Sequence, residues 1–543
     1  MSYTDLSRLR PGTASRHRSC ALSEERLMAV DVDVVVVGFG PGGEVVTSLL
    51  GQAGHRVLVL DKAPAPYGQP RMSTLDGEIA RVLQHAADRA EAMREAIQAP
   101  NILIYGADGD PVPPIDWDYR IAGHWSHYSL HQPNIEAALE ARIAQNPSVE
   151  VRWGARAIGI DQSTDAVRVT VENADGARSE VSARYVLGFD GAGSFVRQAA
   201  GIELEVLREH DDRWILTDFD ALRALPEAIA RTQYHMDPAR PWFAGPNGAN
   251  RCRTDVRVLP HEDLDEMLHE DYGYAFLEER FGLTREDVRM TRRVAYRFRS
   301  HIARAFRAGR VFLGGDAAHA MTPYMGQGAC CAMRDAANLA WKLRLVLSGA
   351  ADQSLLDTYE PERLPQSEFF VRGSLAIFQY VNELDPEKAA ARDVASRAGE
   401  IDFPPIPGLV AGVIRRDAAG EPAPCAGQLA PQGVVRHGDI EERLDDLVGY
   451  GVQLISPLPL DELLGPDRLA RLAELGAHVL RIEDSADADD TYRDFWAATG
   501  ATALLARPDH YLFGVATDAA DLPVLVDEFL AQVPRAAVTA GVR

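Results

Sequence analysis

Apolar runs that end in glycines recur along the chain and predict parallel strands that lead into helices. After Asp33, the valines at 34–37 form a β-branched, continuously apolar run, as expected of a strand covered on both faces of a parallel sheet. A glycine turn, a helix that ends at Gly54 and a second apolar strand at 56–60 follow it. Later strands near 185–188 and 310–313 also run into glycines and an acidic residue. Ligands bind at the carboxyl ends of strands in open α/β sheets, so these ends are the candidate site.

Other segments show helical spacing or strand alternation. Ile135, Leu139 and Ile143 keep helical spacing, and residues 74–97 are largely helical in character. Three segments alternate as antiparallel strands would: 149–153, 167–171 and 179–183. A long helix is predicted after Gly328 by an apolar stripe of Met333, Ala336, Ala340, Leu343 and Leu347.

The last part of the chain predicts a small α/β unit after a linking region. Strands are predicted at 452–455, 477–482, 503–507 and 511–515, with helices at 467–475 and 522–530. The region before this unit is rich in Ala, Pro and charged residues, with a predicted hinge at 404–408.

Composition limits the classes of partner. A chain of 543 residues suggests two or three domains, and its net charge of −24 disfavours nucleic acid and anionic membrane surfaces. No apolar run approaches the roughly 20 residues of a membrane helix. The five cysteines show no metal-ligand spacing, which favours reduced thiols, a cytoplasmic location and no metal site. Residues 1–30 are arginine-rich without the apolar core of a secretory signal, which favours a disordered leader or an upstream extension.

The first glycine turn has the chemistry of a dinucleotide site. Gly38 permits the tight turn, Gly40 lets the backbone approach a pyrophosphate, and Gly43 lets the helix pack against the strand. Pro41 fits the first helical turn, whose free N–H groups attract phosphate. Asp61, at the end of the second strand, can accept a ribose hydroxyl hydrogen bond. Alone, this pattern leaves NAD and FAD equally open.

Three signatures in order carry a family resemblance. They are the glycine turn with Asp61, the Asp190-Gly191 segment, and Gly315-Asp316 followed by Gly326-Gln327-Gly328. The set resembles the class A flavin-dependent aromatic hydroxylases, which are FAD monooxygenases with the para-hydroxybenzoate hydroxylase fold. The helix after Gly328 and the segment 237–241 are most similar to the branch that contains 3-(3-hydroxyphenyl)propionate hydroxylase and the phenol and polyketide hydroxylases.

The resemblance implies an α/β protein with a Rossmann-like FAD-binding domain, an inserted β-sheet substrate domain and a small C-terminal thioredoxin-like α/β domain. The implied division is a leader at 1–30, FAD-binding segments at 31–197 and 301–380, a substrate domain at 198–300, a linker at 381–430 and the C-terminal domain at 431–543. A homodimer is one possible assembly.

The resemblance also implies the chemistry. FAD would be the bound cofactor, NADPH or NADH the electron donor, and a small phenolic or aromatic compound the substrate. Hydroxylation with O2 would proceed through a flavin C4a-hydroperoxide, ortho to an existing hydroxyl. Two alternatives stay open: epoxidation or Baeyer–Villiger-type oxidation of a polyketide-like substrate, and, from another class, a non-catalytic flavin-binding protein.

Individual roles follow for the matching positions. Asp61 with Lys62 would hold the adenosine ribose, Arg71 would reach the pyrophosphate or the flavin-side loop, and Gln132 would bind the ribityl–phosphate arm. Asp316 would accept a ribityl hydroxyl, and the backbone from Pro323 to Ala329 would lie along the isoalloxazine. Asp190 would serve both FAD and the nicotinamide, with a helix cap as the competing interpretation. The full implied cofactor set is Gly38, Gly40, Pro41, Gly42, Gly43, Asp61, Lys62, Arg71, Gln132, Asp190, Asp316, Pro323, Gly326, Gln327, Gly328 and Ala329.

Candidates for substrate contact come from predicted strands of the middle region. They are Tyr234, His235, Arg251 and Tyr296. Spacing does not show which side chains face the flavin, and each could equally be an ordinary sheet residue. No catalytic side chain is predicted, since the cofactor carries the oxygen chemistry.

Overall fold

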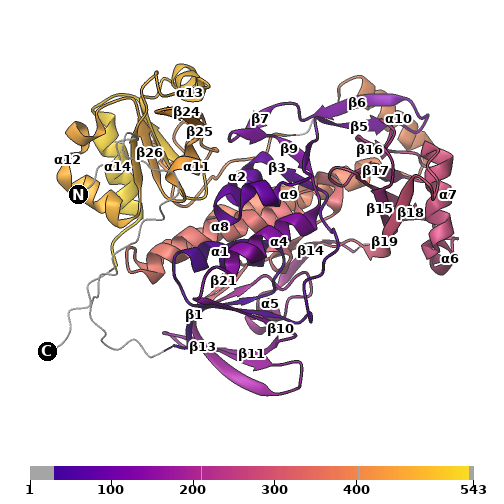
Figure 1. Ribbon diagram of the computed structural model, residues 1–543, viewed down its shortest axis with the longest axis horizontal. Coiled ribbons are helices and arrows are strands. Elements are labelled where there is room, and N and C mark those ends of the chain that lie inside the picture. Colours follow the sequence, from indigo (N-terminus) through magenta and orange to yellow (C-terminus); the bar gives the residue numbers. More distant parts are fainter. Residues whose placement is uncertain (1–29, 210, 401–403, 537–543) are drawn as a thin grey trace.

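The computed structural model describes residues 30–209, 211–400 and 404–536. The chain forms a central part built on an eight-stranded sheet, a seven-stranded sheet at the right of Figure 1, and a C-terminal α/β unit at the upper left. Residues 1–29 of the predicted leader lie outside the described chain.

The central sheet starts from the apolar runs seen in the sequence. β1 (Val32–Val37) lies between β2 (Val57–Asp61) and β13 (Arg178–Gly188) and runs parallel to both. β10 (Val149–Trp153) also pairs parallel with β2, so the predicted antiparallel pairing is wrong for this strand. The long connection from β2 ends in helix α4 (Gln132–Ile143), which lets the two strands run in the same direction. The remaining strands are β11 (Arg156–Gln162), β12 (Val167–Glu172), β21 (Arg307–Ala308) and β22 (Val311–Leu313).

Two helices lie beside the glycine-rich strand ends of the central sheet and border the same space. α1 (Pro41–Gln52) follows β1, and α8 (Gly328–Leu347) packs beside it (Figure 1). α8 is apolar and buried along most of its length, as its stripe predicts. α5 (Phe195–Ala199) follows β13, and α9 (Tyr359–Val381) packs against α8.

The predicted helix over 74–97 is broken into shorter elements. Asp76 caps α2 (Gly77–Ala86) and Asp88 caps α3 (Arg89–Ala92) through side-chain bonds to backbone N–H groups. The neighbouring short strands are β3 (Thr74–Asp76), β4 (Ile97–Gln98), β7 (Arg120–Ile121), β8 (His124–Trp125), β9 (His127–Ser129), β14 (Leu204–Arg208), β20 (Ser300–Ala303) and β23 (His319–Ala320).

The seven-stranded sheet draws on two separate parts of the sequence. Its order is β19-β15-β18-β17-β16-β5-β6, and β5 (Asn101–Tyr105) and β6 (Pro111–Asp116) come from the segment that the sequence assigns to FAD binding. The other strands are β15 (Arg213–Ala221), β16 (Thr232–His235), β17 (Trp242–Pro246), β18 (Arg251–Val258) and β19 (Val288–Arg297). Helices α6 (Leu264–Leu268) and α7 (Glu270–Phe281) lie beside it (Figure 1).

The C-terminal unit is a four-stranded sheet with helices, reached through a region that itself contains α10 (Pro386–Arg397). The sheet order is β27-β26-β28-β29, with β26 and β27 parallel and the other pairs antiparallel. Its elements are β24 (Val434–His437), β25 (Ile440–Arg443), α11 (Leu444–Val448), β26 (Gln453–Ser456), α12 (Leu460–Glu474), β27 (His478–Arg481), α13 (Thr491–Thr499), β28 (Ala503–Ala506), β29 (Leu512–Ala516) and α14 (Asp521–Gln532). Within the described part of the chain, no helix combines the length and apolarity needed to cross a membrane.

Buried ion pairs fasten this unit to the central part. Arg81 of α2 donates hydrogen bonds of 2.7 and 3.0 Å to the carboxylate of Asp445 in α11. His85 lies 3.3 Å from the same carboxylate and stacks on His510. The arginine holds the pKa of Asp445 well below its usual value against the opposing effect of burial. The junction is therefore polar, ion-paired and buried.

Candidate flavin site and adjoining cavity

The glycine turn between β1 and α1 leaves its backbone open toward a cavity. A Cβ on Gly43 would lie 2.2 Å from the Gly38 carbonyl oxygen, so helix and strand approach this closely only without a side chain. A Cβ on Gly40 would meet no protein atom within 4 Å. Gly40 is the N-cap of α1, has no side chain to cap the first N–H groups, and is followed by Pro41. These N–H groups and the positive end of α1 face space of the kind that a pyrophosphate fills.

The loop after β2 presents Arg71 on a fixed backbone. The Gln132 Oε1 atom accepts hydrogen bonds from the backbone N–H groups of Arg71 (2.8 Å) and Met72 (2.7 Å). Arg253 donates to the carbonyl oxygens of Pro70 (2.7 Å) and Arg71 (3.0 Å). The Arg71 side chain remains exposed and lines the cavity, where a guanidinium fork suits a pyrophosphate.

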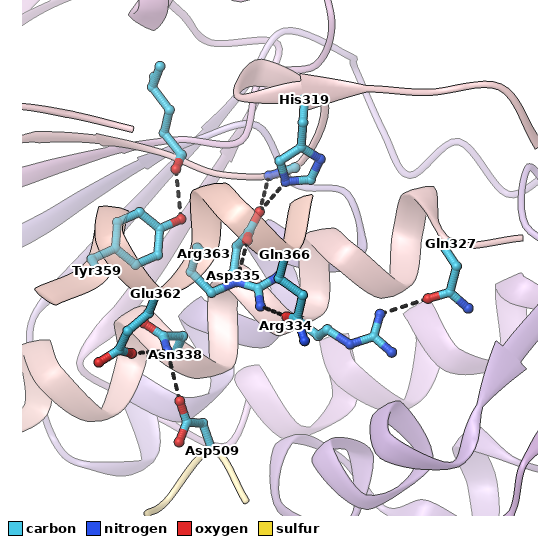
Figure 2. A network of polar contacts seen from close by, with 12 residues as sticks. His319, Gln327, Arg334, Asp335, Asn338, Tyr359, Glu362, Arg363, Gln366 and Asp509 are labelled. Atoms are coloured by element: carbon cyan, nitrogen blue, oxygen red, sulfur yellow. Dashed lines mark hydrogen bonds and ion pairs between the residues drawn. The ribbon is translucent and has the colours of Figure 1, made fainter. Parts of the chain in front are cut away.

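A buried carboxylate holds the segment that carries Asp316. The carboxylate of Asp335 in α8 accepts hydrogen bonds from Gly315 N–H (2.9 Å) and Arg363 Nε (2.8 Å) and lies 2.6 Å from His319 Nε2 (Figure 2). Burial opposes this charge, but His319 and Arg363 outweigh it and lower the pKa of Asp335. Asp316 itself faces the cavity, where burial raises its pKa and His319 partly offsets the effect.

The N-terminus of α8 faces the same cavity. Gly326, with φ of 66°, turns the chain from the short helix η3 (Pro323–Met325) into α8. Gln327 is buried, and its Oε1 accepts a hydrogen bond from Arg334 (2.8 Å, Figure 2). Gly328 and Ala329 line the cavity. The first N–H groups of this 20-residue helix have no partner within the helix, so they supply donors and a positive dipole end to an electron-rich ring edge.

The hydrogen bonds behind this helix continue into the C-terminal unit. Arg334 donates to Glu78 (2.6 Å), which accepts a hydrogen bond from the Tyr511 hydroxyl (2.7 Å). Asn338 of α8 donates to Asp509 (2.8 Å, Figure 2). The C-terminal unit therefore supports the α8 segment that faces the cavity.

Beyond η3 the cavity continues along one face of the seven-stranded sheet, and its volume is about 420 Å³. The wall here is largely aromatic and aliphatic with few polar groups, as is typical of a site for a planar ligand. Tyr324 of η3 stacks on Tyr234 with ring centroids 5.5 Å apart. The sheet-side lining comprises Ile102, Trp214, Leu216, Thr232, Tyr234, Phe243, Arg253, Asp255, Tyr296 and Phe298.

The structure brings most of the sequence-predicted site residues to this cavity. Those that line it are Gly40, Pro41, Gly42, Gly43, Arg71, Gln132, Asp316, Pro323, Gly326, Gly328, Ala329, Tyr234 and Tyr296. Gly38 and Gln327 lie immediately beside lining residues, and both have structural contacts described above.

Several predicted residues lie outside the lining. Asp61 accepts hydrogen bonds from the backbone N–H groups of Phe39 and Ala63, both at 2.8 Å, and Lys62 is exposed. Asp190 accepts hydrogen bonds from Ser194 Oγ (2.5 Å) and Val196 N–H (3.0 Å). Asp190 therefore stabilises the start of α5, the competing interpretation that the sequence left open.

Two substrate candidates do not line the cavity. His235 follows the lining residue Tyr234, and neighbouring strand residues face opposite sides of a sheet. Arg251 is the first residue of β18 and is held by acidic partners there. His235 stacks between Tyr105 (4.5 Å between ring centroids) and Trp242 (3.5 Å), and burial lowers its pKa to about 3. Arg251 donates to Glu95 (2.6 Å) and pairs with Asp220 (3.2 Å). Both side chains are occupied by structural partners.

Sequence reasoning missed three residues of the site. Asp335 lies in the α8 segment that carries the family resemblance, but only the fold shows that it bonds Gly315. Tyr324 lies between Pro323 and Gly326, in a segment for which the sequence predicted only backbone contacts. Asp255 shares a strand face with the predicted candidate Arg251 by alternation, which could have drawn attention to it.

These features fit an FAD-type dinucleotide. The open space at Gly40 could accommodate a pyrophosphate, the carboxylate of Asp316 could accept a polyol hydroxyl, and the α8 N-terminus faces the cavity where a ring would lie. The fold and the site thus define a flavin-binding protein of the mixed α/β type.

Comparisons with known proteins agree with this class. The family described as "FAD binding domain" matches residues 31–374, and that described as "HcaD C-terminal domain" matches residues 427–532. A probable NADH-specific resorcinol 4-hydroxylase of Rhodococcus jostii (strain RHA1) is 33% identical over 92% of this chain and 95% of its own length. A 3-(3-hydroxy-phenyl)propionate/3-hydroxycinnamic acid hydroxylase of Mycobacterium sp. (strain JLS) is 32% identical over 82% and 80%.

Solved structures share the fold. The flavin-dependent monooxygenase PieE, in complex with FAD and substrate, superposes with a TM-score of 0.77 at 22% identity over 93% of this chain and 99% of its own. Aklavinone-11 hydroxylase, in a ternary complex with FAD and aklavinone, gives 0.74 at 24% identity over 93% and 100%. The chain belongs to the FAD-dependent aromatic hydroxylase family, which confirms the resemblance, and FAD is its cofactor.

Proposed function

We propose that this enzyme hydroxylates a small phenolic compound, ortho to an existing hydroxyl, with NADH and O2. One observation supports this most directly: a single cavity joins the dinucleotide cradle to an aromatic wall on the seven-stranded sheet. The relatives named above as resorcinol and hydroxyphenylpropionate hydroxylases support a phenol as substrate, and the first supports NADH as donor.

The bound flavin would supply electron transfer and oxygen activation, and the chain would supply the geometry. Gly40, Arg71 and Asp316 would hold the cofactor, while the N-terminus of α8 would stabilise negative charge on its ring. The aromatic wall, including Tyr234 and Tyr324, would orient a planar substrate and exclude water.

Two rival functions would use the same site. Epoxidation or Baeyer–Villiger-type oxidation of a polyketide-like compound would use the same cofactor. A non-catalytic flavin-binding role would need the same cradle. The proposal also includes a thioredoxin-like C-terminal unit that serves in packing. Its sheet order, β27-β26-β28-β29, supports this assignment.

Purification followed by a phenol screen tests the proposal. We expect a yellow protein whose NADH oxidation rises sharply with resorcinol or 3-(3-hydroxyphenyl)propionate and whose product carries one added oxygen atom. Insertion of oxygen into a ketone or an alkene instead would favour the first rival. FAD binding without stimulated NADH oxidation by any phenol would favour the second, and a protein that cannot be reconstituted with FAD would overturn the whole proposal.

A further inference from the structure

Of the described sheet residues that line the cavity, Asp255 is the one with a carboxyl group. Asp255 lies on β18 between Leu216 of β15 and Phe243 of β17, and all three side chains line the cavity. The Asp255 Oδ1 atom is enclosed and accepts no hydrogen bond from the described residues. An enclosed acceptor without a donor is costly, and a ligand that brings a donor relieves that cost.

We propose that Asp255 accepts the proton of the substrate's phenolic hydroxyl and is a catalytic residue of this enzyme. The substrate O–H bond breaks, an O–H bond forms on the Asp255 carboxylate, and the electron pair stays on the phenolate oxygen. The ring then becomes more nucleophilic, as an electrophilic hydroxylation requires. This inference rests on the proposed phenol hydroxylation.

Elimination within the cavity supports this assignment. Among the described residues that line the cavity, only Asp255 and Asp316 are carboxylic acids, and none is a histidine, lysine or cysteine. Asp316 lies beside the glycine cradle and α8, next to Gly315. No other lining side chain on the sheet is therefore an acceptor that could take a phenolic proton at neutral pH.

The tyrosines around Asp255 hold their protons. Burial raises the pKa of Tyr234 of β16, Tyr296 of β19 and Tyr324 of η3 above the ordinary value. They can therefore donate hydrogen bonds to a phenolate but cannot accept its proton at neutral pH.

Burial and the charged neighbours of Asp255 together set its pKa near neutral pH. Burial raises its pKa to about 7, Arg253 of the same strand and Arg292 of β19 lower it, and Asp218 of β15 raises it. Both arginines are engaged by Asp218, at 2.7 Å for Arg253 and 3.6 Å for Arg292. A carboxylate with a pKa near the working pH is a stronger base than an ordinary aspartate and is still substantially ionised.

Binding to the oxidised, FAD-loaded enzyme without NADH tests the contact without turnover. An unreactive phenol should bind more weakly as the pH falls below about 7, up to tenfold per unit, because protonated Asp255 no longer accepts its proton. The O-methyl ether of the same phenol should show no such dependence. In Asp255→Asn the dependence should vanish for the phenol, and an unchanged dependence would overturn the proposal.

Turnover gives a second measurement. Asp255→Asn should lose about 100-fold or more in the rate of hydroxylation, and more acidic, ring-fluorinated phenols should recover much of it. Asp255→Glu should retain a larger share because it keeps the carboxyl group. If Asp255→Asn hydroxylates every phenol as fast as the parent enzyme, Asp255 is not the base. A parent enzyme that hydroxylates no phenol would instead contradict the proposed function.

Folding of the variant is checked separately. The raised pKa means that the folded state holds a proton that the unfolded state releases, so this group lowers stability as pH rises from about 4 to 7. Asp255→Asn should lack that loss and retain full FAD occupancy. If Asp255→Asn loses FAD, Asp255→Glu provides the test. A pH dependence of phenol binding that is retained in Asp255→Glu would still support the assignment.

Discussion

The carboxylate of Asp335 accepts a hydrogen bond from the backbone N–H of Gly315, 2.9 Å away and 20 residues earlier in the chain. This bond connects α8, whose N-terminus faces the cavity, with the strand end that carries Asp316. Both elements line one cavity, so their relative position is fixed by a buried group outside the cavity lining. Asp335 is thus a positioning residue.

Replacing Asp335 with Asn should lower both stability and flavin affinity. The variant leaves Arg363 without its buried partner, which costs roughly 3–5 kcal/mol. Urea unfolding of the FAD-free protein measures the first effect, and equilibrium dialysis of FAD measures the second, for which we expect at least tenfold weaker binding. Unchanged values for both quantities would show that the Gly315 and Arg363 bonds contribute little.

The two glycines of the first turn should respond differently to alanine. Gly40→Ala meets no protein atom, and Gly40 has φ of −95°, so the FAD-free protein should keep its stability while FAD binding falls. Gly43→Ala places a methyl group against the Gly38 carbonyl and should destabilise the protein itself by about 1–3 kcal/mol. Thermal unfolding with and without FAD separates the two. Equal loss of stability in both variants would contradict the assignment of the open space to a ligand.

The sequence predicted the central part of the fold because local chemistry decides it. The valines of β1, the glycine turn and the Asp316 strand end are each specified by neighbours in the chain. Their meeting at one cavity followed from a general rule of parallel sheets. The direction of β10 did not follow, because alternating side chains do not show which way a strand runs.

The substrate end was less accessible to sequence reasoning. Tyr234 and His235 are adjacent and chemically plausible, but one faces the cavity and the other stacks on Trp242. Which face is which depends on the seven-stranded sheet, whose β5 and β6 come from a distant segment. Asp255 was missed for the same reason.

Asp316→Ala should weaken FAD retention without unfolding the protein. The side chain faces the cavity, so its removal costs the cofactor contact but few protein contacts. Loss of a hydrogen bond to a charged group is worth about 1.5–3 kcal/mol, or roughly 10- to 150-fold in the FAD dissociation constant. Flavin fluorescence titration measures it. Asp316→Asn keeps an acceptor oxygen and should fall between the parent and the alanine variant, whereas equal FAD binding in all three proteins would remove Asp316 from the site.

Glu362 should make the protein sensitive to acid. Its buried carboxylate forms ion pairs with Arg507 of the C-terminal unit (2.6 Å) and Lys342 of α8 (2.7 Å). These cations outweigh the effect of burial and lower the pKa of Glu362 from 4.5 to about 2. A lowered folded-state pKa contributes stability that is complete above pH 4.5 and is lost as the pH falls toward 2. The shift corresponds to about 3 kcal/mol.

The test compares Glu362→Gln with Glu368→Gln, where Glu368 is a partly exposed glutamate of the same helix that pairs with Arg372. At neutral pH Glu362→Gln should be less stable than the parent by roughly 3–5 kcal/mol, since it leaves the buried Lys342 without its carboxylate and Arg507 with Asp509 alone. Between pH 4.5 and pH 3 its urea midpoint should fall less than that of the parent, because the titrating group is gone. Glu368→Gln should follow the parent at both pH values, since an exposed pair contributes about 1 kcal/mol or less. If Glu362→Gln keeps the parent's acid sensitivity, the acid-labile group lies elsewhere. The junction between α9 and the C-terminal unit would then have no electrostatic role in acid stability.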